Sequence, residues 1–137
     1  MEENAYLITG ATSGIGKSIS LALAEKKARL FLIVRDLEKY NQVFNGYNNC
    51  TPILLDLTEV DNIESVLKSK IDCKLSGVVL AAGIEETFPI KLYSPKKIKS
   101  FFDINFFSNF EILRIVTGKK YINNNSSLVI MSSVMSE

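Results

Sequence analysis

The sequence predicts an α/β fold with a doubly wound parallel sheet, in a single domain of residues 1–137. Short continuous runs rich in Val, Ile and Leu recur along the chain, as expected of strands buried on both faces of a parallel sheet. Helix-period segments separate these runs, so the element order is β-α-β-α-β-α-β-α-β, with right-handed crossovers and an expected strand order of 3-2-1-4-5. The runs are residues 6–8, 30–34, 53–55, 78–82 and 128–131.

The intervening segments carry helix signals of their own. Residues 15–27 and 37–45 each place apolar side chains on one helical face. The third segment opens with a stretch close to a capping box, from Thr58 to Asp61. The fourth opens with Ser94 as N-cap and Pro95 at the first helical position, and it is expected to run to about Thr117. The Asn-rich stretch 123–127, before the last apolar run, is expected to be a loop.

Composition excludes several classes of function. Sixteen basic and fifteen acidic residues nearly cancel, so nucleic-acid binding has no electrostatic support. There is no histidine, and Cys50 and Cys73 lack metal-ligand spacing, so we expect no metal site and interpret both cysteines as small hydrophobic residues. The N-terminus lacks the features of a signal peptide, and two unpaired thiols without a secretion signal favour a reducing cytoplasm. No apolar stretch approaches the length that a membrane span needs.

The glycine-rich turn after the first apolar run carries the strongest functional signal. The stretch TGATSGIGKS places Gly10, Gly14 and Gly16 between a strand and a helix. Glycine there permits a tight turn and a close approach of backbone amides to a pyrophosphate, and the helix N-terminus favours an anion. Thr12 and Ser13 add hydroxyl donors. The alternative is an ordinary turn that is rich in glycine.

This turn resembles the TGxxxGxG fingerprint of the short-chain dehydrogenase/reductase family. The match is complete, and the resemblance extends along the whole chain. It implies an NAD(P)-binding Rossmann domain that transfers hydride between a nicotinamide dinucleotide and a small carbonyl or alcohol. The cofactor-binding residues that the resemblance implies in this turn are Thr9, Gly10, Thr12, Ser13, Gly14, Ile15 and Gly16.

Three further segments support the same resemblance. LLDLT ends the third strand as in the family, which implies that Asp56, with Leu57 beside it, contacts adenine. LAAGI resembles the family's NNAGI after the fourth strand and implies that Ala82 and Gly83 line the nicotinamide ribose. Here Leu80 and Ala81 replace the asparagines, and Ala81 is counted with the cofactor-binding residues.

The resemblance also implies two catalytic residues. FFDINFF aligns Asn105 with the family's structural and catalytic asparagine, and VIMSSV aligns Ser133 with the catalytic serine. A helical wheel places Asn105 on an apolar face with Phe101 and Phe102. An amide there costs about 1–3 kcal/mol unless it is hydrogen-bonded. The alternative is that this amide is satisfied by the sheet edge and takes no part in chemistry.

The end of the second strand favours NADP over NAD as cofactor. An acidic residue there would bind the ribose 2′-hydroxyl of NAD, whereas an arginine accommodates the 2′-phosphate of NADP. By alignment with the family, Val34 takes the acidic position and Arg35 follows it. The alternative is that Arg35 is a solvent-exposed arginine and Asp36 only caps the next helix. The basic residue often found inside the glycine turn is absent, since Ser13 holds its place.

The family's acid/base tyrosine, and the lysine four residues later, lie on a helix after the serine strand, whereas Ser133 is followed here by four residues. The one Tyr-x-x-x-Lys string, from Tyr93 to Lys97, precedes the serine and contains Pro95, which disfavours a helical pair. We therefore expect the dinucleotide-binding half of a short-chain oxidoreductase without its catalytic Tyr/Lys pair, truncated after the fifth strand. The alternatives are a non-catalytic dinucleotide-binding module and a truncated gene product.

Apolar surface on the fourth helix predicts self-association. Phe107 points away from the predicted inner face, and Phe110 lies off the inner stripe. The last apolar run, residues 128–131, would also form an uncharged sheet edge that is open to pairing. We expect a homo-oligomer.

Overall fold

The structure, a computed structural model that describes residues 3–133, contains one five-stranded parallel sheet with the order β3-β2-β1-β4-β5. The predicted fold class and strand order are therefore confirmed. Because all strands are parallel, their carboxyl ends lie along one edge of the sheet. The strands are β1 Ala5–Thr9, β2 Arg29–Val34, β3 Cys50–Leu54, β4 Leu75–Leu80 and β5 Ile122–Ile130.

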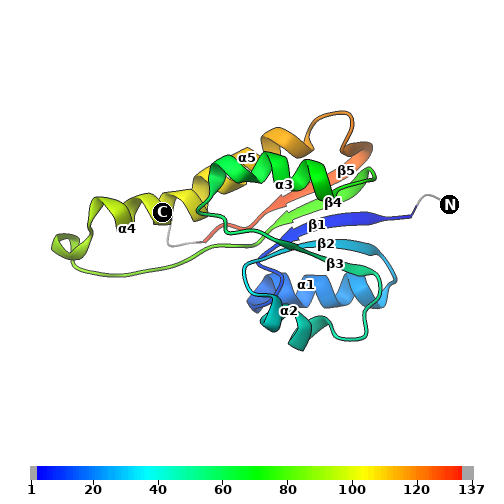
Figure 1. Ribbon diagram of the computed structural model, residues 1–137, viewed down its shortest axis with the longest axis horizontal. Coiled ribbons are helices and arrows are strands. Elements are labelled where there is room, and N and C mark those ends of the chain that lie inside the picture. The colour runs from blue at the N-terminus through cyan, green and yellow to red at the C-terminus, as the bar shows by residue number, and fades with distance from the viewer. Residues whose placement is uncertain (1–2, 134–137) are drawn as a thin grey trace.

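Helices cover the two faces of the sheet (Figure 1). Helices α1 (Gly14–Glu25) and α2 (Leu37–Phe44) pack on one face, and α3 (Ile63–Lys70) and α5 (Ser108–Val116) pack on the other. Alternate side chains of β1 enter the two resulting cores, since Leu7 joins the α3/α5 core and Ile8 joins the α1/α2 core. In residues 3–133 no helix is both long and apolar enough to cross a membrane.

The predicted fourth helix is present but contains a π-helical turn. Its N-cap is confirmed, since the Ser94 hydroxyl accepts a hydrogen bond from the Lys97 amide at 3.2 Å. Helix α4 (Pro95–Phe102) leads into the π turn Asp103–Phe107 and then into α5. A π turn inserts one extra residue and so rotates the apolar stripe relative to a regular helix. No residue of α4 is buried, and Phe102 at its end is 51% exposed, because α4 extends beyond the sheet (Figure 1). The predicted inner face that includes Phe102 is therefore wrong.

The predicted capping box at Thr58 is also absent. Helix α3 begins only at Ile63, after a 3₁₀ turn Val60–Asn62, and no side-chain hydrogen bond caps either element. The Thr58 hydroxyl and amide instead donate to the Asp56 carboxylate. The carboxylate competes successfully for these donors because it lies only two residues away.

Strand β5 begins earlier than predicted and is less buried. Residues 123–127 belong to the strand, so the expected loop there is wrong. A register shift between Leu75 and Gly77 accommodates them, and Ser126 bridges the irregular stretch by donating to the Leu75 carbonyl and accepting from the Asn123 amide. The strand lies at the sheet edge, and Val129 is 44% exposed, so burial on both faces does not extend to β5.

Close backbone contact joins the turn after β1 to the turn after β4. Gly10 has φ +66°, and a Cβ on it would lie 2.8 Å from the backbone of Ala81 and Ala82. A Cβ on Gly16, in the first turn of α1, would lie 2.2 Å from the Gly10 carbonyl oxygen. Both distances are shorter than any van der Waals contact that real Cβ atoms make. These two positions therefore require glycine for α1 to pack against the sheet.

Gly16→Ala is expected to destabilise the fold by about 3 kcal/mol or more, because the new methyl group can be accommodated only if α1 moves away from the turn. Gly14→Ala is the matched control in the same turn. A Cβ there meets no atom within 4 Å, and the residue's φ of +52° alone should cost about 1–2 kcal/mol. Urea unfolding monitored by circular dichroism measures the free energy of unfolding of both variants. Equal losses for the two variants would contradict the steric explanation.

Candidate functional site

A pocket of about 490 Å³ lies where the carboxyl ends of β1, β2, β3 and β4 meet. The chain runs outward from β1 through β2 to β3 and then returns to place β4 on the other side of β1, so β1 and β4 flank the topological switch point of the sheet. Open α/β sheets bind ligands at such a point. The pocket includes nine of the predicted site residues, namely Gly10, Thr12, Ser13, Arg35, Asp56, Leu57, Ala81, Ala82 and Gly83.

The β1–α1 turn contributes amide groups to this site. Ser13 is the N-cap residue of α1 in an extended conformation, and its side chain makes no capping hydrogen bond. The amides of the first turn of α1 are thus left for another acceptor, which an anion satisfies well. Gly14, Ile15 and Gly16 form that first turn. They are not among the residues that line the pocket in the described part of the chain.

Thr9 has a supporting position. Its side chain is fully buried, and its Oγ1 accepts hydrogen bonds from the amides of Ala81 and Ala82, both at 3.0 Å. These bonds tie the end of β1 to the turn after β4. Thr9 does not line the pocket but holds together the two turns that do, and its predicted contact with the cofactor stays a prediction.

The β2–α2 turn and α2 form one wall of the pocket, which carries the basic residues Arg35 and Lys39 together with the acidic residues Asp36 and Glu38. Val34 and Arg35 line it, followed by Lys39 and Gln42 from α2. Asp36 is the N-cap of α2, and its Oδ1 accepts from the Glu38 and Lys39 amides at 2.9 and 3.1 Å. The predicted capping role of Asp36 is confirmed, and the first amides of α2, unlike those of α1, are already satisfied.

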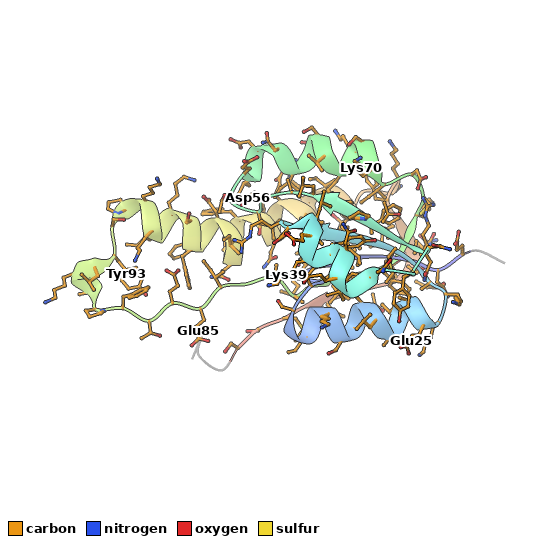
Figure 2. All side chains as sticks on the ribbon, turned by 60° about the horizontal axis from the view of Figure 1, so that its bottom comes forward. Glu25, Lys39, Asp56, Lys70, Glu85 and Tyr93 are labelled. Carbon is orange, nitrogen blue, oxygen red and sulfur yellow. The ribbon has the colours of Figure 1, made fainter. Side chains whose placement is uncertain are left out.

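Asp56, just beyond β3, also lines the pocket; Figure 2 labels it together with Lys39. Its Oδ1 accepts hydrogen bonds from the Thr58 amide at 2.9 Å and from the Thr58 hydroxyl at 2.8 Å. The amide bond is the main reason that the pKa of Asp56 lies below its usual value, with the hydroxyl bond second and the charge of Arg35 contributing less. Asp56 is therefore an ionised acceptor at neutral pH.

Asn105 lies in the π turn and binds the turn after β4 through both ends of its amide. Its Oδ1 accepts from the Ile84 amide and its Nδ2 donates to the Ile84 carbonyl, each at 2.9 Å. The Asn109 side-chain amide donates to the Asn105 carbonyl at 3.1 Å. Asn105 thus connects the π turn to the segment that lines the pocket, and its hydrogen bonds account for a polar amide on an apolar helical face. Its predicted catalytic role stays a prediction.

The other candidates for chemistry lie outside the pocket lining. Ser133 follows β5 and is exposed. The Tyr93 hydroxyl donates to the Glu86 carbonyl at 2.6 Å, and the Lys97 ammonium lies 4.2 Å from the centre of the Phe88 ring. Figure 2 shows Tyr93 near one end of the molecule and Asp56 near its middle, so the structure gives no support to Tyr93 and Lys97 as a catalytic pair at this pocket.

Cysteine and metal chemistry have no support at this pocket. Burial raises the pKa of the Cys50 thiol to about 11, which keeps it protonated and unreactive. Within residues 3–133, no three His, Cys, Asp or Glu side chains cluster in a way that could hold a metal ion.

Sequence reasoning missed several residues of the pocket. Lys39 had a usable signal, because a basic residue in the first turn of α2 lies one helical turn from Arg35. The apolar residues had no such signal, since only the three-dimensional arrangement brings them to the pocket. They are Ile33, Leu55, Ile84 and Ile104.

The lowered pKa of Asp56 predicts a pH-dependent contribution to stability. The contribution is fully present above the usual carboxyl pKa of 3.8 and is lost as the pH falls through the lower pKa of the folded state. Asp56→Asn should therefore reduce the dependence of unfolding free energy on pH between about pH 5 and pH 2. Urea titrations across this range measure it, with Thr51→Val, which retains every carboxylate, as control. An unchanged slope in Asp56→Asn would refute the expected shift.

Comparison with known proteins agrees with this geometry. Residues 4–137 match the short chain dehydrogenase family. An uncharacterised oxidoreductase of Staphylococcus epidermidis is 27% identical over 117 residues, which is 83% of this chain and 51% of the relative. Another from Schizosaccharomyces pombe is 32% identical over 82% of this chain and 46% of the relative. The chain therefore spans about half the length of the curated relatives it matches.

The solved structures give the same result for the fold. A dehydrogenase/reductase from Sinorhizobium meliloti superposes with a TM-score of 0.87 at 20% identity, over 100% of this chain and 56% of that one. The chain belongs to the short-chain dehydrogenase/reductase family and corresponds to the N-terminal half of its members.

Proposed function

We propose that this chain binds NADP(H) and is the nucleotide-binding half of an oxidoreductase that transfers hydride to or from a small carbonyl or alcohol substrate. The observation that carries the choice of cofactor is the wall of the pocket beside the end of β2. There Val34 cannot accept a hydrogen bond from a ribose hydroxyl, whereas Arg35 and Lys39 offer positive charge to a phosphate. NAD is the less favoured cofactor.

The remaining parts of a dinucleotide have matching partners around the pocket. The pyrophosphate is assigned to the turn that contains Gly10, Gly14 and Gly16, where the first amides of α1 have no side-chain cap. Adenine is assigned to Asp56, whose carboxylate is ionised at neutral pH. The nicotinamide ribose is assigned to Ala82 and Gly83 at the end of β4.

The hydride-transfer chemistry is proposed for the whole protein. Asn105 and Ser133 are the catalytic candidates within the 137 residues, and the family's Tyr/Lys pair is not expected among them. The alternative, a non-catalytic dinucleotide-binding module, is supported by Asn105, whose amide makes one donated and one accepted hydrogen bond with the Ile84 backbone, a structural role that needs no chemistry. The proposed location is the cytoplasm.

NADPH is expected to bind this chain more tightly than NADH, and Arg35→Ala should weaken NADPH binding about tenfold or more while leaving NADH binding nearly unchanged. A hydrogen bond to a charged group is typically worth about 1.5–3 kcal/mol, and the loss of one such bond to the 2′-phosphate corresponds to this weakening of NADPH binding. Titration calorimetry measures all four affinities.

Lys26→Ala is the matched control, because Lys26 is an exposed basic residue at the opposite end of α1 and should leave both affinities unchanged. Equal or reversed affinities of the wild-type chain for NADPH and NADH would contradict the NADP assignment. With carbonyl substrates added, the 137-residue chain should bind NADPH without oxidising it, because proton transfer by a positioned acid typically contributes 10²–10⁴-fold.

We further propose that the chain associates with a second copy through α4, the π turn and α5. Phe106, Phe107 and Phe110 are 56%, 47% and 60% exposed on this element. Figure 1 shows α4 and the loop before it extending beyond the sheet, where other elements of the described chain do not cover them. Burial of each phenylalanine would stabilise a dimer by about 1.5–3 kcal/mol.

Phe110→Lys is expected to shift the chain from dimer toward monomer, because a charged side chain cannot be buried in this apolar contact without a partner. Light scattering coupled to size exclusion measures the mass. Leu54→Lys, an equally exposed apolar position on the opposite edge strand, is the control and should leave the dimer intact. A monomeric mass for the wild-type chain at all concentrations would contradict the proposed association with a second copy.

A further inference from the structure

The hydrogen bonds between Thr58 and Asp56 have an asymmetry that bears on ligand recognition. Thr58 offers two donors, its amide and its hydroxyl, and both reach the same oxygen, Oδ1 of Asp56, at 2.9 and 2.8 Å. Within residues 3–133 the carboxylate accepts its hydrogen bonds from Thr58 at Oδ1 and none at the other oxygen, Oδ2, whereas Asp56 itself lines the pocket. One half of the carboxylate is therefore fixed by the protein and the other half is left for a ligand.

Thr58 does not serve the adjacent helix. The sequence suggests a capping residue, but the structure starts the 3₁₀ turn Val60–Asn62 and then α3 without a side-chain cap. The Thr58 hydroxyl is instead committed as a donor to Asp56. Two donors on one oxygen restrict rotation of the carboxylate about its χ2 angle, which is otherwise a broad and soft torsion.

We propose that Thr58 is a positioning residue that gives this site its preference for adenine. By holding Oδ1, it directs Oδ2 into the pocket as an acceptor for the exocyclic amino group of the base. A base that carries a carbonyl oxygen at the same place, such as hypoxanthine, presents an acceptor to the carboxylate and is repelled. The inference rests on the proposed function, in which the pocket binds an adenine dinucleotide.

The charges around the Asp56 carboxylate do not provide this discrimination by themselves. Arg35 and Lys39 come from the β2–α2 turn and from α2, and Glu38 lines the same wall. These groups attract or repel the phosphates of an adenine dinucleotide and of its hypoxanthine analogue equally, because the two ligands differ only at the base. The preference for one base over the other must therefore come from the direction of a donor or an acceptor, which Thr58 controls.

The test compares two ligands, NADPH and its analogue with hypoxanthine in place of adenine, by titration calorimetry. Wild-type protein should bind NADPH at least about tenfold more tightly than the analogue, since a site that donates to or accepts from a specific group rejects an analogue that cannot pair with it. Thr58→Val removes the hydroxyl but keeps the shape and the backbone amide. It should lower the ratio of the two affinities about three- to tenfold.

Three further variants make the result specific. Thr58→Ser retains the hydroxyl and should restore the wild-type ratio, which a role in packing alone would not produce. Thr58→Ala is a second deletion that must lower the ratio in the same direction, so the test does not depend on the folding of the valine variant. Thr51→Val removes an exposed hydroxyl on β3 outside the pocket and should leave the ratio unchanged.

The outcomes separate this inference from the proposed function. If the wild-type protein binds neither dinucleotide, the proposed function is wrong and the inference falls with it. If NADPH binds and is preferred, but Thr58→Val and Thr58→Ala weaken both ligands equally or leave the ratio unchanged, only the inference about Thr58 is overturned. Tight NADPH binding without any preference for adenine in the wild-type protein also overturns it.

Discussion

The contact between the turn after β1 and the turn after β4 is the constraint on which the site depends. Gly10 and Gly16 bring backbone atoms together at distances that exclude any side chain, and the buried Thr9 hydroxyl binds the amides of Ala81 and Ala82 across the same gap. These contacts place the start of α1 directly beside the switch point of the sheet. If α1 were displaced to make room for a Cβ, its uncapped first turn would move away from the β1–α1 turn that lines the pocket.

The segment after β4 is held from two sides. Thr9 binds its first residues from the central strand, and Asn105 binds Ile84 from the π turn on the opposite layer. Strand, turn and helix are thus linked through a few hydrogen bonds to backbone groups that have no strand partner. The pocket wall formed by residues 81–84 is therefore fixed by the fold before any ligand binds, which reduces the entropy cost of binding.

The sequence predicted the five strands, their order and half of the residues that line the pocket, because apolar runs and glycine spacing report directly on burial and backbone approach. It failed where one residue alters a regular pattern. The π turn at Asp103–Phe107 shifts the apolar face of the helix, and α4 before it extends beyond the sheet and leaves Phe102 exposed, yet neither feature leaves a signal in periodicity. The start of β5 was missed because its Asn and Ser residues pair in an irregular register at a sheet edge, and the partner of Thr58 was missed because a nearby carboxylate replaced the helix as its acceptor.

The crystal structure of this chain with NADPH is the most direct test of the account. The pyrophosphate should lie against the first turn of α1, with the adenine at Asp56 and the 2′-phosphate in contact with Arg35 and Lys39. A dinucleotide bound away from the β1–α1 turn, or one whose 2′-phosphate makes no contact with either basic residue, would contradict it.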